Sequence, residues 1–193
     1  MNNKEYEDRV MLDLKQYKKL LNLFKSGKKI SQVNIYYDVK DKRLLNAHHV
    51  LRIRKIKNGN NELTLKIKRK DYDEEINRIL TKTELRNFSF ESLNNDLEIK
   101  KAFDELKINT SDLKCVGKLK TIRIEKHKDD CLLVLDKNIY PGIIDYNLEV
   151  ESSSREEAHN VVKNICAEFG IDYDEKYISK SRRAIMAYSQ RKK

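Results

Sequence analysis

The sequence predicts an α+β protein in which about eight antiparallel strands curl into a closed barrel, with helices packed on the outside. Short stretches of strictly alternating apolar and polar residues recur along the 193-residue chain, and stretches with helical spacing separate them. In most of the strand stretches, the ionisable residues occupy the same alternate positions. An open sheet with one solvated face explains any single stretch, whereas a barrel with its charged face inside explains the recurrence.

The strand candidates show which residues share a face. In residues 5–10, a period of two places Glu5, Glu7 and Arg9 on one side. The same pattern occurs in residues 50–55, 63–68, 121–125, 132–136 and 145–151, and more weakly in residues 32–38 and 74–80. Their polar positions hold Arg52, Arg54, Lys66, Lys68, Arg123, Asp136, Glu149 and Glu151. Such charges inside a barrel must neutralise one another or bind a ligand, and a face with both signs suits a metal ion with a polyphosphate.

Four segments have helical spacing. Residues 14–25 follow Asp13 as the expected N-cap, and residues 98–106 carry apolar side chains on one face. A third helix begins at the serine cluster 152–154, where Ser153 or Ser154 starts a capping box, and ends at Gly170. The fourth covers residues 181–188.

Composition narrows the class of protein. The chain has 41 Lys and Arg against 31 Asp and Glu, a formal charge of +10, which fits nucleic acid, a small polyphosphate or simply a solvated lysine-rich surface. The three cysteines show no CxxC spacing, so neither a disulfide framework nor a zinc cluster is indicated. A transmembrane run of about 18 apolar residues and a signal peptide are both lacking, which predicts a cytoplasmic protein.

Several segments together resemble the CYTH superfamily, the triphosphate tunnel metalloenzymes. Residues 5–9 resemble the E-x-E-x-K signature, residues 32–38 resemble Q-x-N-x-Y-Y/F-D, and residues 52–54 resemble R-x-R. Residues 63–66, 117–123 and 145–151 resemble L-T-L-K, G-x-L-x-T-x-R and D-Y-E-L-E-x-E, while Glu75 and Lys180 match single late positions. The order and the coverage, from Glu5 to about Lys180, make the resemblance far more specific than any one motif.

The resemblance implies one CYTH-like tunnel domain, with a core of about residues 4–182, that hydrolyses a triphosphate with Mg²⁺ or Mn²⁺ by in-line attack of water. The implied metal ligands are Glu5, Glu7, Asp136, Glu149 and Glu151. The implied substrate ligands are Arg9, Arg52, Arg54, Lys66, Lys68, Arg123 and Lys180, and the implied catalytic residues are Glu5, Glu7, Arg9 and Glu75. The substrate would be tripolyphosphate, a nucleoside triphosphate or thiamine triphosphate, and the protein a monomer or homodimer. The alternatives are a class IV adenylate cyclase and a non-catalytic polyphosphate- or nucleotide-binding protein, and nucleic acid is not the expected partner.

Two positions depart from the family pattern. Arg9 stands where the family has lysine, and a guanidinium cannot serve as a general base because it stays protonated. Water would then be activated by the metal or by a carboxylate such as Glu5, Glu7 or Glu151. Asn147 replaces an acidic residue, but the pair Glu149 and Glu151 is intact.

Overall fold

The computed structural model describes residues 3–70, 72–174 and 176–190, with the backbone only for residues 3–5. The strands of this described part are hydrogen-bonded in the order β1-β5-β4-β3-β2-β6-β7-β8, which is the order of a closed antiparallel barrel. The predicted fold class is therefore confirmed. No helix within the described ranges is long and apolar enough to cross a membrane.

Each predicted strand is present, and most are longer than predicted. The strands are β1 (Asn3–Leu12), β2 (Lys28–Asp38), β3 (Val50–Ile56), β4 (Asn61–Lys68), β5 (Asp73–Leu80), β6 (Lys114–Lys128), β7 (Cys131–Tyr140) and β8 (Ile143–Ser152). The helices are α1 (Leu14–Leu20), α2 (Arg43–Asn46), α3 (Lys82–Arg86), α4 (Leu97–Glu105), α5 (Arg155–Phe169) and α6 (Lys180–Gln190), with 3-10 turns η1 (Phe90–Asn95) and η2 (Thr110–Asp112). The prediction that the first helix reaches residue 25 is wrong, because α1 ends at Leu20 and turns follow it. The short helices α2 and α3 were not predicted, since one turn is too short for a periodic pattern.

The chain forms two compact units. Unit 1 consists of Val33–Lys118 and the described residues of Met1–Lys4 and Lys180–Lys193, and unit 2 consists of Glu5–Gln32 and Leu119–Ser179. The single domain implied by the family resemblance remains a prediction.

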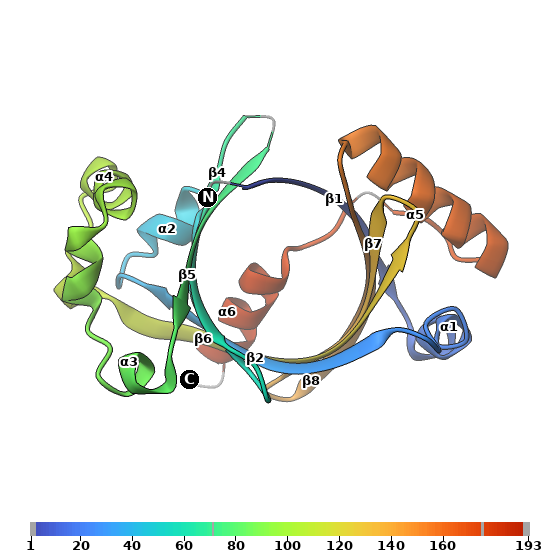
Figure 1. The fold of residues 1–193 in the computed structure, drawn as a ribbon, viewed down its shortest axis with the longest axis horizontal. Helices are drawn as coiled ribbons and strands as arrows, with labels where there is room; N and C mark the ends of the chain where they lie inside the picture. Colours follow the sequence, from blue (N-terminus) through green and yellow to red (C-terminus); the bar gives the residue numbers. More distant parts are fainter. Residues whose placement is uncertain (1–2, 71, 175, 191–193) are drawn as a thin grey trace. The chain divides into compact units, whose positions relative to one another are not determined.

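In unit 2, the apolar face of β7 and β8 is covered by helices. Leu133 and Val150 are fully buried in one cluster with Val162 of α5 and Leu20 of α1. Figure 1 shows α5 running beside β7. As predicted, α5 is capped at both ends, by the Ser154 hydroxyl at its start and by a glycine in the left-handed conformation at its end. The opposite, polar face of the same strands is therefore left for the charged residues.

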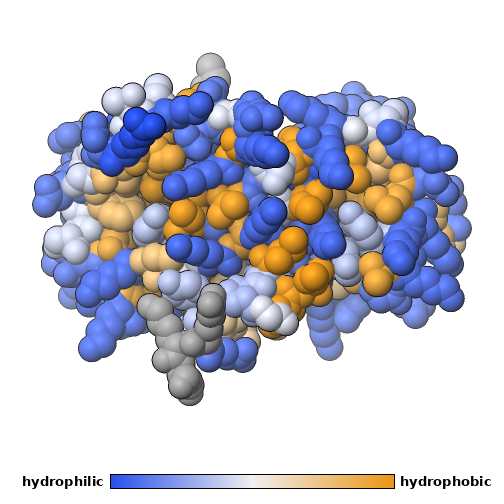
Figure 2. All heavy atoms as spheres, turned by 90° about the horizontal axis from the view of Figure 1, so that it is seen from below, coloured by the Kyte–Doolittle hydropathy of each residue, from blue (hydrophilic) through white to orange (hydrophobic). Residues whose placement is uncertain are grey.

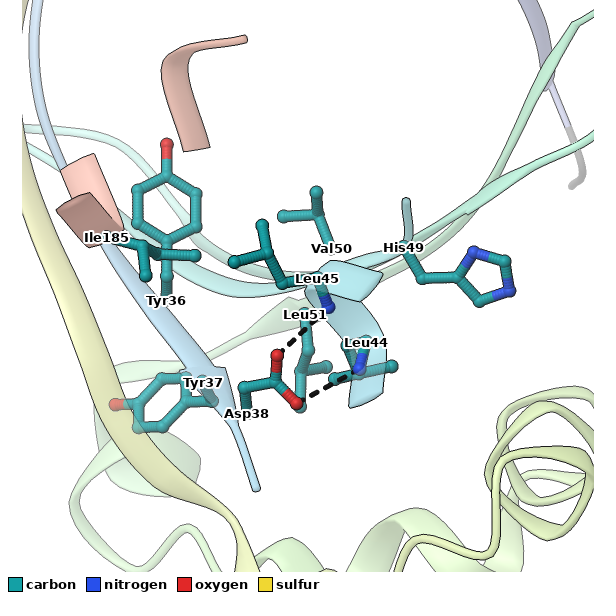
Figure 3. Close-up of a pocket in the computed structure, with 9 residues that line it drawn as sticks. All are labelled: Tyr36, Tyr37, Asp38, Leu44, Leu45, His49, Val50, Leu51 and Ile185. Carbon is teal, nitrogen blue, oxygen red and sulfur yellow. Dashed lines mark hydrogen bonds between the residues drawn. The ribbon is translucent and has the colours of Figure 1, made fainter. Parts of the chain in front are cut away.

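In unit 1, strands β3, β4 and β5 bury their apolar side chains against α4 and the turns beside it (Figure 1). Asp38 at the end of β2 holds the short helix α2, because its carboxylate accepts hydrogen bonds from the backbone N–H groups of Leu44 (3.1 Å) and Leu45 (3.0 Å), as Figure 3 shows. Gly117 of β6 allows α6 to approach closely, since a Cβ atom there would lie 3.2 Å from the backbone of Ile185. On the face that Figure 2 shows, hydrophilic residues are interspersed with hydrophobic ones.

Candidate metal centre and phosphate-binding residues

The register of β1 on β8 brings three predicted metal ligands together in unit 2. Glu7 lies opposite Glu151, and Arg9 lies opposite Glu149. One carboxylate oxygen of each of Glu7, Glu149 and Glu151 lies within 4.8 Å of the others, so this triad can hold a metal ion. Clustered carboxylate oxygens are the ligands that hard divalent cations such as Mg²⁺ and Mn²⁺ prefer.

Arg123 joins the carboxylate triad to Asp136. Its Nε and one terminal nitrogen each donate to the Asp136 carboxylate at 3.0 Å, and the same terminal nitrogen donates to Glu149 Oε2 at 3.2 Å. Asp136 is completely buried and lies outside the triad. Burial alone would lower the pKa of Arg123, but the charge of Asp136 and then that of Glu149 raise it above its ordinary value. Arg123 is therefore a permanent cation beside the triad.

Arg9 is the second guanidinium on this face of unit 2. It is buried, at 7% exposure, and makes ion pairs with Glu7 and, at 3.0 Å, with Glu149 Oε1. Its Nε has no hydrogen-bond partner among the described residues. A buried donor without a partner is costly unless an acceptor is supplied from outside the protein.

The charged face of unit 2 has an acidic excess. The described guanidinium groups on it, Arg9 and Arg123, contact a larger number of carboxylates: Glu7, Glu125, Asp136, Glu149 and Glu151. The side chain of Glu5, a predicted metal ligand, lies outside the described residues. Because these carboxylates outnumber the guanidinium groups that contact them, a ligand that brings positive charge would suit this face.

Unit 1 gathers most of the predicted phosphate ligands on β3 and β4. Lys66 Nζ lies 3.1 Å from Asp73 Oδ2 and 3.4 Å from Glu75 Oε1, and Arg52 lies 4.0 Å from Glu75. Arg54 pairs with Glu62 at 3.6 Å and donates to the amide oxygen of a neighbouring asparagine. The Arg52 Nε is a buried donor without a hydrogen-bond partner in the described part of the chain. These cations therefore share a face of unit 1 with the acids that pair with them.

The acids of unit 1 respond to these cations. Burial tends to raise the pKa of Glu75, but the charges of Arg52 and Lys66 outweigh it, and the pKa is lowered. Asp73 behaves in the same way, with Lys66 as the main opposing charge. Both groups are therefore ionised near neutral pH.

The remaining predicted residues are less enclosed. Lys68 pairs with Asp73 at 3.1 Å but its side chain is 52% exposed, and Lys180 is the first residue of α6 in unit 1. Sequence reasoning did not name the acids Glu62 and Asp73. Both lie on the same face of their strands as the predicted charged residues, because Glu62 is four residues from Lys66 and Asp73 is two residues from Glu75. It also did not name Tyr177, whose ring centre lies 4.5 Å from Cζ of Arg9 and which belongs to residues without regular structure.

Comparison with known proteins places these residues in a family context. A family model described as the CYTH domain matches residues 3–183. The "Putative triphosphatase YjbK" of Bacillus subtilis is 28% identical over 173 residues, which are 86% of this chain and 87% of that protein. The crystal structure of "a putative adenylate cyclase" from Bacillus halodurans is 29% identical, with a TM-score of 0.83 over 94% of this chain and 97% of that one. The Hippeastrum "putative adenylyl cyclase HpAC1", for which a dominant triphosphatase activity is described, shares the fold at 21% identity, with a TM-score of 0.77 over 94% and 93% of the two chains.

Proposed function

Because the chain belongs to the CYTH domain family, we propose that it is a metal-dependent triphosphatase that hydrolyses inorganic tripolyphosphate, a nucleoside triphosphate or thiamine triphosphate. The similarity to the "Putative triphosphatase YjbK" of Bacillus subtilis, over most of both chains, supports this choice. The chain would act as one CYTH domain on a small-molecule substrate.

The observation that carries the proposal is the acidic triad next to fixed guanidinium groups. Glu7, Glu149 and Glu151 converge within 4.8 Å, while Arg123 lies 3.2 Å from Glu149. Carboxylates alone would bind a cation and guanidinium groups alone would bind an anion, so the combination suits a metal ion that carries a phosphate. Within the described ranges, the Nε of Arg9 in unit 2 and the Nε of Arg52 in unit 1 each lack a hydrogen-bond partner, and each would suit an acceptor-rich ligand.

The triad fits Mg²⁺ or Mn²⁺ by the chemistry of its donors. When bound, such an ion neutralises charge on the phosphoryl oxygens and orients the substrate. The protein's own part is to bind and orient the triphosphate. Arg9 and Arg123 are the proposed donors to phosphoryl oxygens in unit 2, and Arg52, Arg54 and Lys66 are the cations that unit 1 offers for the same task. Glu7, Glu151 or Glu5 would accept the proton of the attacking water, because Arg9 stays protonated.

Release of phosphate tests the proposal directly. Tripolyphosphate, ATP and thiamine triphosphate would each be incubated with the protein, with and without Mg²⁺ or Mn²⁺. We expect metal-dependent phosphate release from at least one of them, its loss in Glu149→Gln, and weaker tripolyphosphate binding in Arg52→Ala. The exposed residues Glu168 and Arg86 provide the matched controls Glu168→Gln and Arg86→Ala. Tight tripolyphosphate binding without any phosphate release would refute hydrolysis and favour a non-catalytic binding protein.

A class IV adenylate cyclase is the second candidate. The Bacillus halodurans structure that supports it is 29% identical and matches nearly the whole chain. Cyclisation uses the same metal and phosphate ligands but makes the ribose hydroxyl the nucleophile instead of water. Formation of cyclic AMP from ATP and Mg²⁺, measured by liquid chromatography, would select this candidate.

A further inference from the structure

Tyr177 lies over Arg9 in unit 2. The centre of its ring is 4.5 Å from Cζ of the Arg9 guanidinium, within the range of a cation–π contact. Arg9 belongs to β1, whereas Tyr177 belongs to the irregular residues 176–179 that precede α6. Tyr177 is 39% exposed although Arg9 is buried, so the ring closes the guanidinium off from solvent on one side.

Tyr173, four residues before Tyr177, makes a second contact with β1. The Tyr173 hydroxyl donates to Asp8 Oδ2 at 2.7 Å, and His159 Nδ1 of α5 lies 3.0 Å from the same oxygen. Neighbouring strand residues point to opposite faces, so Asp8 and Arg9 present their side chains on different sides of β1. Tyr173 therefore contacts β1 on the side of Asp8, and Tyr177 contacts it on the side of Arg9.

Arg9 contacts the same carboxylates that form the proposed metal centre. Its guanidinium pairs with Glu7 and with Glu149, which are two of the three members of the triad. A guanidinium and a divalent cation attract these oxygens by the same electrostatic force, so they compete for them. The strength of the competition depends on how firmly Arg9 is held in place.

We propose that Tyr177 is a positioning residue, which holds Arg9 between Glu7 and Glu149 and thereby lowers the affinity of the triad for a divalent cation. The inference rests on the metal centre of the proposed function and adds a residue that tunes it. Arg9 Nε makes no hydrogen bond to any described residue, so the ring and the two carboxylates are what orient the guanidinium. Removing the ring frees Arg9 to leave the triad, and the triad then binds a metal ion more tightly.

Isothermal titration with Mn²⁺ alone tests this role without any substrate. Wild type, Tyr177→Phe and Tyr177→Leu would be compared, and Phe is the matched control because it keeps the aromatic face. The energy of a cation–π contact at a partly exposed site corresponds to a change of about two- to fivefold in a binding constant. Tyr177→Leu is therefore expected to bind Mn²⁺ more tightly by that factor. Tyr177→Phe is expected to match wild type, and Arg9→Met to bind Mn²⁺ at least as tightly as Tyr177→Leu. Adding Glu151→Gln to Tyr177→Leu should abolish the increase in Mn²⁺ affinity, because Glu151 is one of the three ligands of the triad.

The outcomes separate this role from a purely structural one. A structural tyrosine would lower the melting temperature in Tyr177→Leu without raising Mn²⁺ affinity, and that result would overturn the proposal. Mn²⁺ affinity that is equal in wild type and Tyr177→Leu would also overturn it, while leaving the metal centre in place. A wild-type protein that takes up no Mn²⁺ would instead refute the metal centre itself.

Discussion

Asp136 and Glu151 were both predicted as metal ligands, but the structure gives them different surroundings. Asp136 is completely buried and accepts two hydrogen bonds of 3.0 Å from Arg123. Glu151 belongs to the carboxylate triad, and its side chain is 24% exposed and 4.0 Å from Arg123. We therefore predict that Asp136→Asn mainly destabilises the fold, whereas Glu151→Gln mainly weakens metal binding.

The expected loss of stability follows from the burial of the pair. Removing one partner of a buried ion pair costs about 3–5 kcal/mol, because the other charge is left uncompensated. In Asp136→Asn the amide oxygen can still accept one bond and Arg123 keeps Glu149 at 3.2 Å, so the lower value, about 3 kcal/mol, applies. For a domain of this size, that corresponds to a fall in melting temperature of roughly 6–12 °C. The weaker contact of Glu151 predicts a cost of at most about 1 kcal/mol for Glu151→Gln.

Thermal unfolding and Mn²⁺ titration of the two variants provide the test. Asp136→Asn should melt earlier and keep its Mn²⁺ affinity within about threefold, a change of less than 1 kcal/mol. Glu151→Gln should melt near wild type and lose at least about tenfold in Mn²⁺ affinity, in line with the loss of one ligand. Equal melting temperatures in wild type and Asp136→Asn would refute the stability argument. A loss of Mn²⁺ affinity in Asp136→Asn as large as that in Glu151→Gln would place Asp136 among the metal ligands instead.

Three further predictions concern other parts of the chain. Arg9→Lys should raise metal-dependent phosphate release, and an unchanged rate would indicate that water is activated by the metal or a carboxylate. The pKa values of Glu75 and Asp73 are lowered in the folded protein, so these carboxylates stabilise it fully at a pH above their ordinary pKa values of 4.5 and 3.8. This stabilisation is lost as the pH falls through the lower pKa values of the folded state. The difference in urea midpoint between wild type and Glu75→Gln should therefore shrink below pH 4.5, and a difference that stays constant would contradict the lowered pKa. Gly117→Val should lower the urea midpoint by an amount equivalent to about 1–3 kcal/mol in the free energy of unfolding, because the valine side chain would clash with Ile185. A midpoint equal to that of wild type would mean that α6 can shift without loss of stability.

The alternation of residues predicted the strands and their charged faces because the geometry of a strand has a fixed period of two. Arg9, Arg123 and Glu149 occupy such alternate positions. Arg9 and Glu149 are buried and the Arg123 side chain is only 11% exposed, as a barrel with its charged face inside requires. Alternation does not say which strand pairs with which. The distance of 3.0 Å between Arg9 and Glu149 depends on the register of β1 with β8, two strands that lie far apart in the sequence. The family resemblance assigned both residues to one site but gave no register.

Other features left no periodic signal. Helix α2 is a single turn, and what stabilises it is the Asp38 carboxylate from the preceding strand rather than an apolar stripe of its own. Tyr177 contacts Arg9 from residues without regular structure, so no periodic pattern marks it. Contacts of this kind depend on the tertiary structure, so a one-dimensional pattern cannot contain them.

The position of Arg9 changes how its departure from the family lysine is understood. A lysine can act as a base only after losing its proton, and two carboxylates beside it would raise its pKa and oppose that loss. Glu7 and Glu149 occupy that place around Arg9. An ammonium there would become a base only once a divalent cation has taken up the charge of these carboxylates. The higher rate of phosphate release expected in Arg9→Lys should therefore appear only with metal present and should increase with pH. Arginine at this position cannot act as a base, and it keeps a permanent positive charge beside the triad.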